Sequence, residues 1–147
     1  MTQSPAIVPY AHPHRAEVVS LWQDVFGHAT GHNDASLAID KKVDAADGLF
    51  FLALKDRAVV GTILAGYDGH RGWLYSVAVH AAHRNQGIGS ALVLHAEEEL
   101  ARRGCMKLNL QIVEGNEKVT AFYESLGFSV EPRVSMGKRI SANIPSA

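Results

Sequence analysis

The stretch that decides the fold is HRNQGIGSAL, residues 83–92, which joins an apolar run to a helical one. WLYSVAV, residues 73–79, predicts a strand before it, and the apolar spacing of residues 88–100 predicts a helix after it. Gly87 and Gly89 stand at the start of that helix, although a glycine costs about 1 kcal/mol of helix stability relative to alanine. We therefore expect this junction to require bare backbone.

A bare helix N-terminus suits an anion. About four N–H groups there lack helical partners and carry partial positive charge, and glycines let a phosphate approach them closely. The stretch matches neither the P-loop pattern nor the dinucleotide fingerprint, because Leu92 stands where the third glycine of the latter belongs. From these residues alone, a pyrophosphate-binding loop and an ordinary loop-to-helix junction both stay open.

Working outward, the apolar patterns predict an alternation of strands and helices. We expect strands at 6–10, 49–56, 58–67, 73–79 and 105–113, helices at 14–26, 34–45, 87–103 and 117–127, and one or two final strands within 128–140. This order predicts an α/β fold in a single domain over residues 1–147. Its central sheet should be mixed and mostly antiparallel, with six to seven strands and helices on both faces.

Composition excludes several classes of partner and site. With 47% hydrophobic and 20% charged residues and a net charge of −1, the chain has no general attraction to nucleic acid or anionic membranes. Its longest apolar run, Leu49–Leu54, is far too short to span a bilayer, and no signal-peptide pattern begins the sequence. A lone Cys105 excludes an internal disulfide and a cysteine-based zinc site. We expect a cytoplasmic protein that binds no metal, nucleic acid or membrane.

Two motifs resemble one known family. RNQGIG, residues 84–89, has the form [Q/R]-x-x-G-x-[G/A] and resembles the acetyl-coenzyme A loop of the GNAT family of N-acetyltransferases. GNEKVTAFYESLGF, residues 115–128, is similar to a later family segment, in the right order and at the right distance. AGYDGHRG (65–72) and SMGKRI (135–140) resemble the small bacterial YpeA-like branch. The resemblance covers about residues 51–140.

The resemblance implies that acetyl-coenzyme A (acetyl-CoA) is a co-substrate. Backbone N–H groups at the glycine loop would hold its pyrophosphate, and strand backbone would bind its pantetheine arm. The cofactor-binding residues it implies are Val77, Ala78, Val79, Arg84, Asn85, Gln86, Gly87, Ile88, Gly89, Ser90, Asn116 and Tyr123.

Acetyl transfer to an amine requires a neutral amine, a donor for the developing oxyanion and a proton for the departing thiolate. The resemblance implies that Tyr123 protonates the sulfur and that a backbone N–H near Val79 serves the oxyanion. By spacing alone, Tyr123 is a core residue on an apolar helical stripe. Glu114 is the first candidate for the general base; Asp68, His70 and His80 are others, and the reaction proceeds without a side-chain base in some relatives.

The acceptor is open between a small-molecule amine and a protein or peptide amine, and a homodimer also stays open. Residues expected to line the acceptor site are Trp22, His32, Asn33, Asp34, Tyr67 and Tyr75. For Trp22 the competing interpretation is simple helix packing. Two other functions also compete: a non-catalytic module that binds or senses acyl-CoA, and an interaction protein whose glycine loop is only structural.

Overall fold

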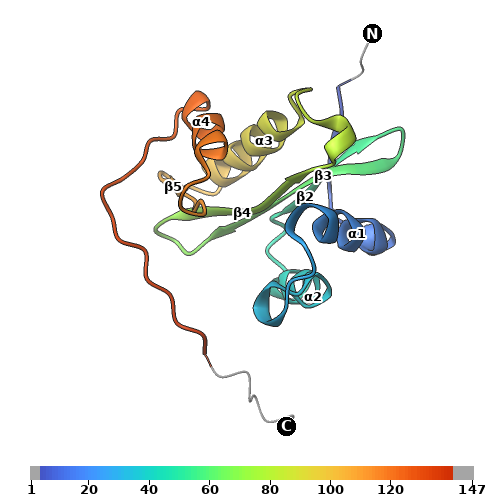
Figure 1. Ribbon diagram of the computed structural model, residues 1–147, viewed down its shortest axis with the longest axis horizontal. Helices are drawn as coiled ribbons and strands as arrows, with labels where there is room; N and C mark the ends of the chain where they lie inside the picture. Colours follow the sequence, from blue (N-terminus) through green and yellow to red (C-terminus); the bar gives the residue numbers. More distant parts are fainter. Residues whose placement is uncertain (1–3, 141–147) are drawn as a thin grey trace. The chain divides into compact units, whose positions relative to one another are not determined.

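The computed structural model describes residues 4–140 (Figure 1). The chain divides into two compact units. The first unit runs to Gln111 and holds a five-stranded sheet, and the second begins at Ile112 and holds a single helix. The strands are β1 (Ala6–Pro9), β2 (Phe50–Lys55), β3 (Ala58–Tyr67), β4 (Gly72–Val79) and β5 (Leu108–Asn109).

The sheet is mixed and mostly antiparallel, as predicted. Its strands lie in the order β1-β2-β3-β4-β5; the first four pair antiparallel, and β5 pairs parallel to β4. The predicted count of six to seven strands is wrong for the part of the chain that the structure describes, which has five.

The predicted strands that are shortened or absent all follow α3, the helix Ile88–Arg102. The strand expected at 105–113 is reduced to Leu108–Asn109, and residues 128–140, all of them described, form no strand. A strand exists only where a neighbour supplies ladder hydrogen bonds. In 128–140, Pro132 has no N–H to offer, and the N–H of Arg133 bonds locally to the Glu131 carbonyl at 2.8 Å. The apolar side chains that suggested a strand there are 76–91% exposed: Val130, Val134, Met136 and Ile140.

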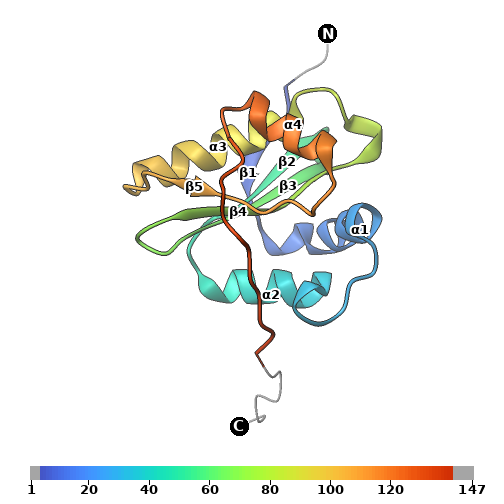
Figure 2. The ribbon, with the colours of Figure 1, turned by 60° about the vertical axis from the view of Figure 1, so that its left-hand side comes forward.

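Helices cover both faces of the sheet in the first unit, as predicted. Helices α1 (Arg15–Phe26) and α2 (Ala35–Ala45) lie on one face and α3 (Ile88–Arg102) on the other (Figure 2). Short 3-10 turns precede each of them: η1 (His12–His14), η2 (Gly31–Asn33) and η3 (Ala81–His83). The second unit contains α4 (Glu117–Ser125).

Two neighbouring residues of β3 show how the two faces are packed. A Cβ on Gly61 would stand 2.9 Å from the Leu92 side chain and 3.1 Å from that of Ile88, so α3 packs directly on bare β3 backbone. Thr62 points to the opposite face, where its hydroxyl meets Trp22 of α1. Gly61 therefore allows the close approach that fixes the start of α3 against the sheet.

This packing predicts different outcomes for two glycines of the same strand. Gly61→Ala should destabilise the fold by about 1–3 kcal/mol, because the new methyl overpacks the contact with α3. Gly66→Ala should be neutral or stabilising by less than about 1 kcal/mol, since a Cβ there meets nothing within 4 Å. Urea unfolding of both variants measures the difference; equal losses would refute the close contact.

Candidate active site

Strand β4 changes its pairing in the middle. Thr62 pairs with Ala78 but Leu64 pairs with Tyr75, so Ser76 and Val77 together face Ile63 alone. Ser76 has a left-handed backbone, with φ of 49°. Two residues opposite one define a β-bulge, which bends a strand and redirects its backbone groups, and bulges are common beside active sites.

The edge of β4 beyond the bulge is open within residues 4–111. On that edge of β4, the neighbouring strand β5 pairs only with Gly72 and Trp73, which come before the bulge. The N–H of His80 donates to the Val60 carbonyl at 2.8 Å, so by strand alternation the Val79 N–H points away from β3, toward the open edge. Residues 77–79 thus offer backbone groups with which an extended ligand can pair.

The loop after β4 is held by its own polar contacts. Arg84 Nε donates to the Val79 carbonyl at 3.3 Å, and His80 Nδ1 accepts from the Ala82 N–H at 3.1 Å. Asn85 and Gly87 both have a positive φ, of 62° and 79°. The chain therefore turns twice through left-handed conformations before α3 begins, and glycine is the residue that does so without strain.

The N-terminus of α3 has no side-chain cap. Asp34 caps α2 by accepting from the Leu37 N–H at 3.0 Å, whereas Gly87 offers no side chain, and the first turn of α3 has no acidic residue. A Cβ on Gly87 would meet nothing within 4 Å, so the glycine leaves room outside the protein rather than inside it. An uncapped helix N-terminus beside such an open position fits a pyrophosphate. The Ile88 side chain is buried, so only its backbone can face a ligand.

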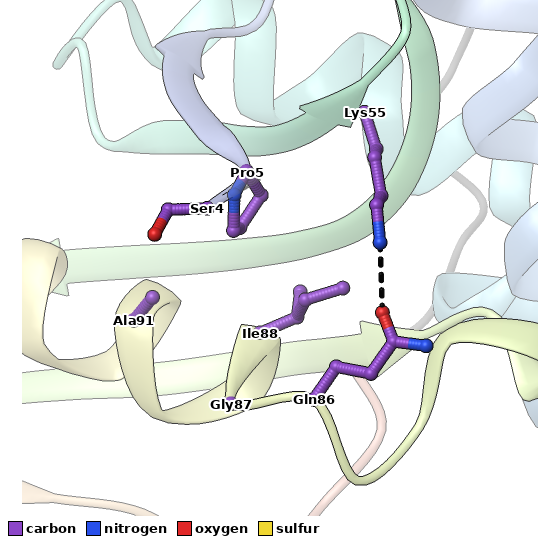
Figure 3. Close-up of a pocket in the computed structure, with 7 residues that line it drawn as sticks. All are labelled: Ser4, Pro5, Lys55, Gln86, Gly87, Ile88 and Ala91. Carbon is purple, nitrogen blue, oxygen red and sulfur yellow. Dashed lines mark hydrogen bonds between the residues drawn. The ribbon is translucent and has the colours of Figure 1, made fainter. Parts of the chain in front are cut away.

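Lys55 of β2 lies beside the same loop. Its Nζ donates to Gln86 Oε1 at 3.0 Å, across a pocket at the base of the loop (Figure 3). The residues that line this pocket are Ser4, Pro5, Lys55, Gln86, Gly87, Ile88 and Ala91. Lys55 thus places a positive charge near the expected anion site, and nothing in the sequence motif indicated it.

In the second unit, Tyr123 is 8% exposed and packs edge-to-face against Phe122 and Phe128. Burial raises the pKa of its phenol from 10 to about 12, so the hydroxyl keeps its proton at neutral pH. Asn116 Oδ1 accepts from the Val119 N–H at 3.3 Å and caps α4. Glu114 is exposed in the turn before α4, not at the end of a strand as expected.

Several other candidates have structural contacts. Asp68 Oδ1 accepts from the N–H groups of His70 and Arg71 at 2.8 and 2.7 Å, and these bonds hold the pKa of the Asp68 carboxyl below its usual value. Trp22 is a core residue, stacked on Phe50. Tyr75 remains exposed, with its ring 5.6 Å from the buried amine of Lys42. His32, Asn33 and His70 lie at the surface, and Tyr67 reaches the Gly69 and Gly104 carbonyls at 3.4 and 3.3 Å.

Comparisons with known proteins agree with this geometry. The model of the acetyltransferase (GNAT) family matches residues 15–128. An acetyltransferase of Yersinia enterocolitica is 36% identical over 124 residues, which cover 84% of this chain and 87% of that protein. The chain belongs to the GNAT family and is an acyltransferase.

Solved structures share the fold. An aminoglycoside N-acetyltransferase, AAC(6')-Iy, in complex with a bisubstrate analogue, is similar with a TM-score of 0.77 and 18% identity, over 95% of this chain and all of that one. The PaiA N-acetyltransferase of Thermoplasma acidophilum, in complex with coenzyme A, gives 0.77 and 17%, over 90% of this chain and 94% of that one.

None of the helices within 4–140 combines the length and apolar character that a membrane crossing requires. Across the same residues, no three side chains of His, Cys, Asp or Glu gather as a metal site would need.

The buried phenol of Tyr123 predicts a loss of stability at high pH. The folded chain holds this proton up to about pH 12, whereas the unfolded chain releases it near pH 10. The free energy of unfolding should therefore fall as pH rises from 10 to 12, by at most about 1.4 kcal/mol per pH unit from this group. Tyr123→Phe should flatten that part of the curve.

Urea unfolding of both chains across this pH range is the measurement. Tyr10, whose pKa burial also raises, is present in both and cancels in the difference. Parallel curves for the two chains would contradict the assignment.

Proposed function

We propose that this protein transfers the acetyl group of acetyl-CoA to a primary amine by direct attack within a ternary complex. The observation that carries the proposal is the uncapped N-terminus of α3, with open space at Gly87, beside the open edge of β4. The coenzyme A complex of the similar PaiA protein and the bisubstrate complex of AAC(6')-Iy support it.

The proposed binding residues lie in the glycine loop, at the end of β4 and before α4. The N–H groups of Asn85, Gly87, Gly89 and Ser90 hold the pyrophosphate at the start of α3. Three side chains keep the loop in place. Arg84 bonds to the Val79 carbonyl, Gln86 accepts from Lys55, and Ile88 is buried in the core. The backbone of Val77, Ala78 and Val79 pairs with the pantetheine arm, and Asn116 is proposed as a further hydrogen-bond partner of that arm.

The chemical step needs one donor for the oxyanion and one for the sulfur. The amine nitrogen attacks the thioester carbon, and the Val79 N–H stabilises the oxygen as it gains charge. The C–S bond then breaks, and the thiolate takes the proton of the Tyr123 hydroxyl. A phenol with a pKa of about 12 is a weak acid, but the burial that raises its pKa also makes a neighbouring thiolate more basic.

The nitrogen must also lose a proton. We assign that role to Glu114, directly or through water, and Glu114 releases the proton to solvent. Tyr123 regains a proton from solvent, which restores the starting state. Both units then belong to one catalytic domain over residues 1–147. The acceptor is a small-molecule, peptide or protein amine, since similar proteins include an aminoglycoside acetyltransferase and a ribosomal-protein-S18-alanine acetyltransferase of Escherichia coli. The proposed compartment is the cytoplasm.

Acetyl-CoA should stabilise the folded chain through the glycine loop. At a hundred times its dissociation constant, a ligand of the folded state adds about 2.7 kcal/mol. Gly87→Glu should abolish this gain, because a carboxylate would occupy the anion site. Gly69→Glu is the matched control, since Gly69 also has a positive φ and open space but lies in the turn before β4.

Thermal unfolding with and without acetyl-CoA measures the effect in all three chains. A shift kept by Gly69→Glu and lost by Gly87→Glu supports the site. The absence of any shift in the unmodified chain would overturn the proposed function.

Tyr123→Phe separates an enzyme from a module that only binds acyl-CoA. Removing the acid should lower kcat by about 10²- to 10⁴-fold while the thermal shift with acetyl-CoA persists. Release of free thiol from acetyl-CoA is the readout, with an aminoglycoside, an amino-acid amide and a peptide with a free N-terminus as acceptors. Turnover unchanged by the substitution would remove Tyr123 from the mechanism.

A further inference from the structure

A buried hydrogen-bond chain links α1 to the bulge of β4. Trp22 Nε1 donates to Thr62 Oγ1 at 2.8 Å, and Thr62 Oγ1 donates to the Ser76 carbonyl at 2.9 Å. Thr62 is fully buried and Trp22 is 4% exposed. The chain therefore passes through the core from a helix to the strand whose backbone faces the proposed thioester.

The Thr62 hydroxyl both donates and accepts a hydrogen bond. A hydroxyl has one proton to donate, here given to Ser76, and lone pairs to accept, here from Trp22. Its neighbours on both sides in β3 are apolar or glycine, so Thr62 is the one side-chain hydroxyl in the run AVVGTILAG. A buried hydroxyl placed between two partners aligns both of them.

The hydrogen bond from Thr62 to the Ser76 carbonyl also fixes the orientation of the next N–H group, that of Val77. The Ser76 carbonyl and the Val77 N–H belong to one planar trans peptide and point in opposite directions. Because Thr62 holds that carbonyl toward the core, the Val77 N–H is turned away from Thr62. Ser76 itself has a φ of 49°, a conformation that serine rarely adopts, so the bulge needs a contact that maintains it.

We propose that Trp22 and Thr62 are positioning residues for acetyl transfer. They hold the bulge of β4 in the conformation that presents the backbone of Val77–Val79 to the thioester carbonyl. This inference rests on the proposed function, since it requires acetyl-CoA to pair with that strand. Neither residue touches the substrate; both act through the Ser76 peptide.

Trp22 and Thr62 could instead serve only to pack the core. Substitutions at these two residues separate a packing role from a hydrogen-bonding role. Trp22 also stacks on Phe50, with ring centroids 5.9 Å apart. Trp22→Phe keeps a ring for the stack but removes the N–H that aligns Thr62. Thr62→Val keeps the shape of the side chain but removes both hydrogen bonds, and Thr62→Ser restores the hydroxyl.

The test uses acetyl-CoA carrying ¹³C at the thioester carbonyl, so that no acceptor is needed. A hydrogen bond to a carbonyl lowers its infrared stretching frequency, and isotope-edited difference spectra report that frequency in the bound state. Calorimetry gives the dissociation constant of the same complexes. Thr30→Val is the matched control, because it removes an exposed hydroxyl from a loop before α2.

In the unmodified chain, the carbonyl frequency should fall on binding. Thr62→Val should lose at least half of that fall, while its dissociation constant changes by less than about threefold, because the pyrophosphate site is intact. Thr62→Ser and Thr30→Val should keep the full shift, and Trp22→Phe should lose part of it. With an active acceptor, Thr62→Val should lower kcat by about 10- to 100-fold, as expected for a misplaced reacting group.

The outcomes distinguish the two proposals. If the unmodified chain does not bind acetyl-CoA, the proposed function fails. If it binds with a lowered carbonyl frequency and Thr62→Val shows the same frequency, the positioning role fails while the function stands. Should Thr62→Val not fold, Trp22→Phe decides, and a full shift in that variant overturns the inference.

Discussion

The arrangement of the site depends on one constraint: β4 must stay paired with β3 while giving up regular pairing at Ser76 and Val77. Below the bulge, β4 lies between β3 and β5, as an inner strand does. Above it, within residues 4–111, its far edge is open, and its last residues lead directly into the glycine loop. One irregularity in one strand thus separates the part of β4 that builds the sheet from the part that can pair with a ligand.

Two glycines near this strand serve opposite purposes. Gly61 makes room for the Leu92 and Ile88 side chains and belongs to the packing of α3 on the sheet. At Gly87, a Cβ would meet no other part of the protein, so packing does not require a glycine there. Gly87 instead provides a left-handed turn and exposed backbone. The sequence shows only two glycines in apolar surroundings. Their different roles emerge from what a Cβ would meet, which depends on residues distant in the chain.

Patterns of local origin were predictable from sequence. The helices, the four long strands and the capping by Asp34 and Asn116 follow from spacing and capping chemistry within about ten residues. The final strands within 128–140 were not predictable, because alternation indicates a face but cannot supply a partner strand. Thr62 was overlooked for a related reason. Its hydroxyl bonds to Trp22 of α1 and to Ser76 of β4, and both partners are distant from it in the sequence. A lone threonine in a buried apolar run was the available signal.

The bulge also changes which residues of WLYSVAV face each side of the sheet. In a regular strand, residues of the same parity share a face. A Cβ on Gly72 would face Leu100 and Leu108, on the α3 side, yet Ala78, of the same parity, packs with Val18 and Trp22 on the α1 side. The extra residue exchanges the α3 side and the α1 side of the sheet halfway along β4. The continuous apolar sequence of this strand therefore contains a change of face that alternation alone does not reveal.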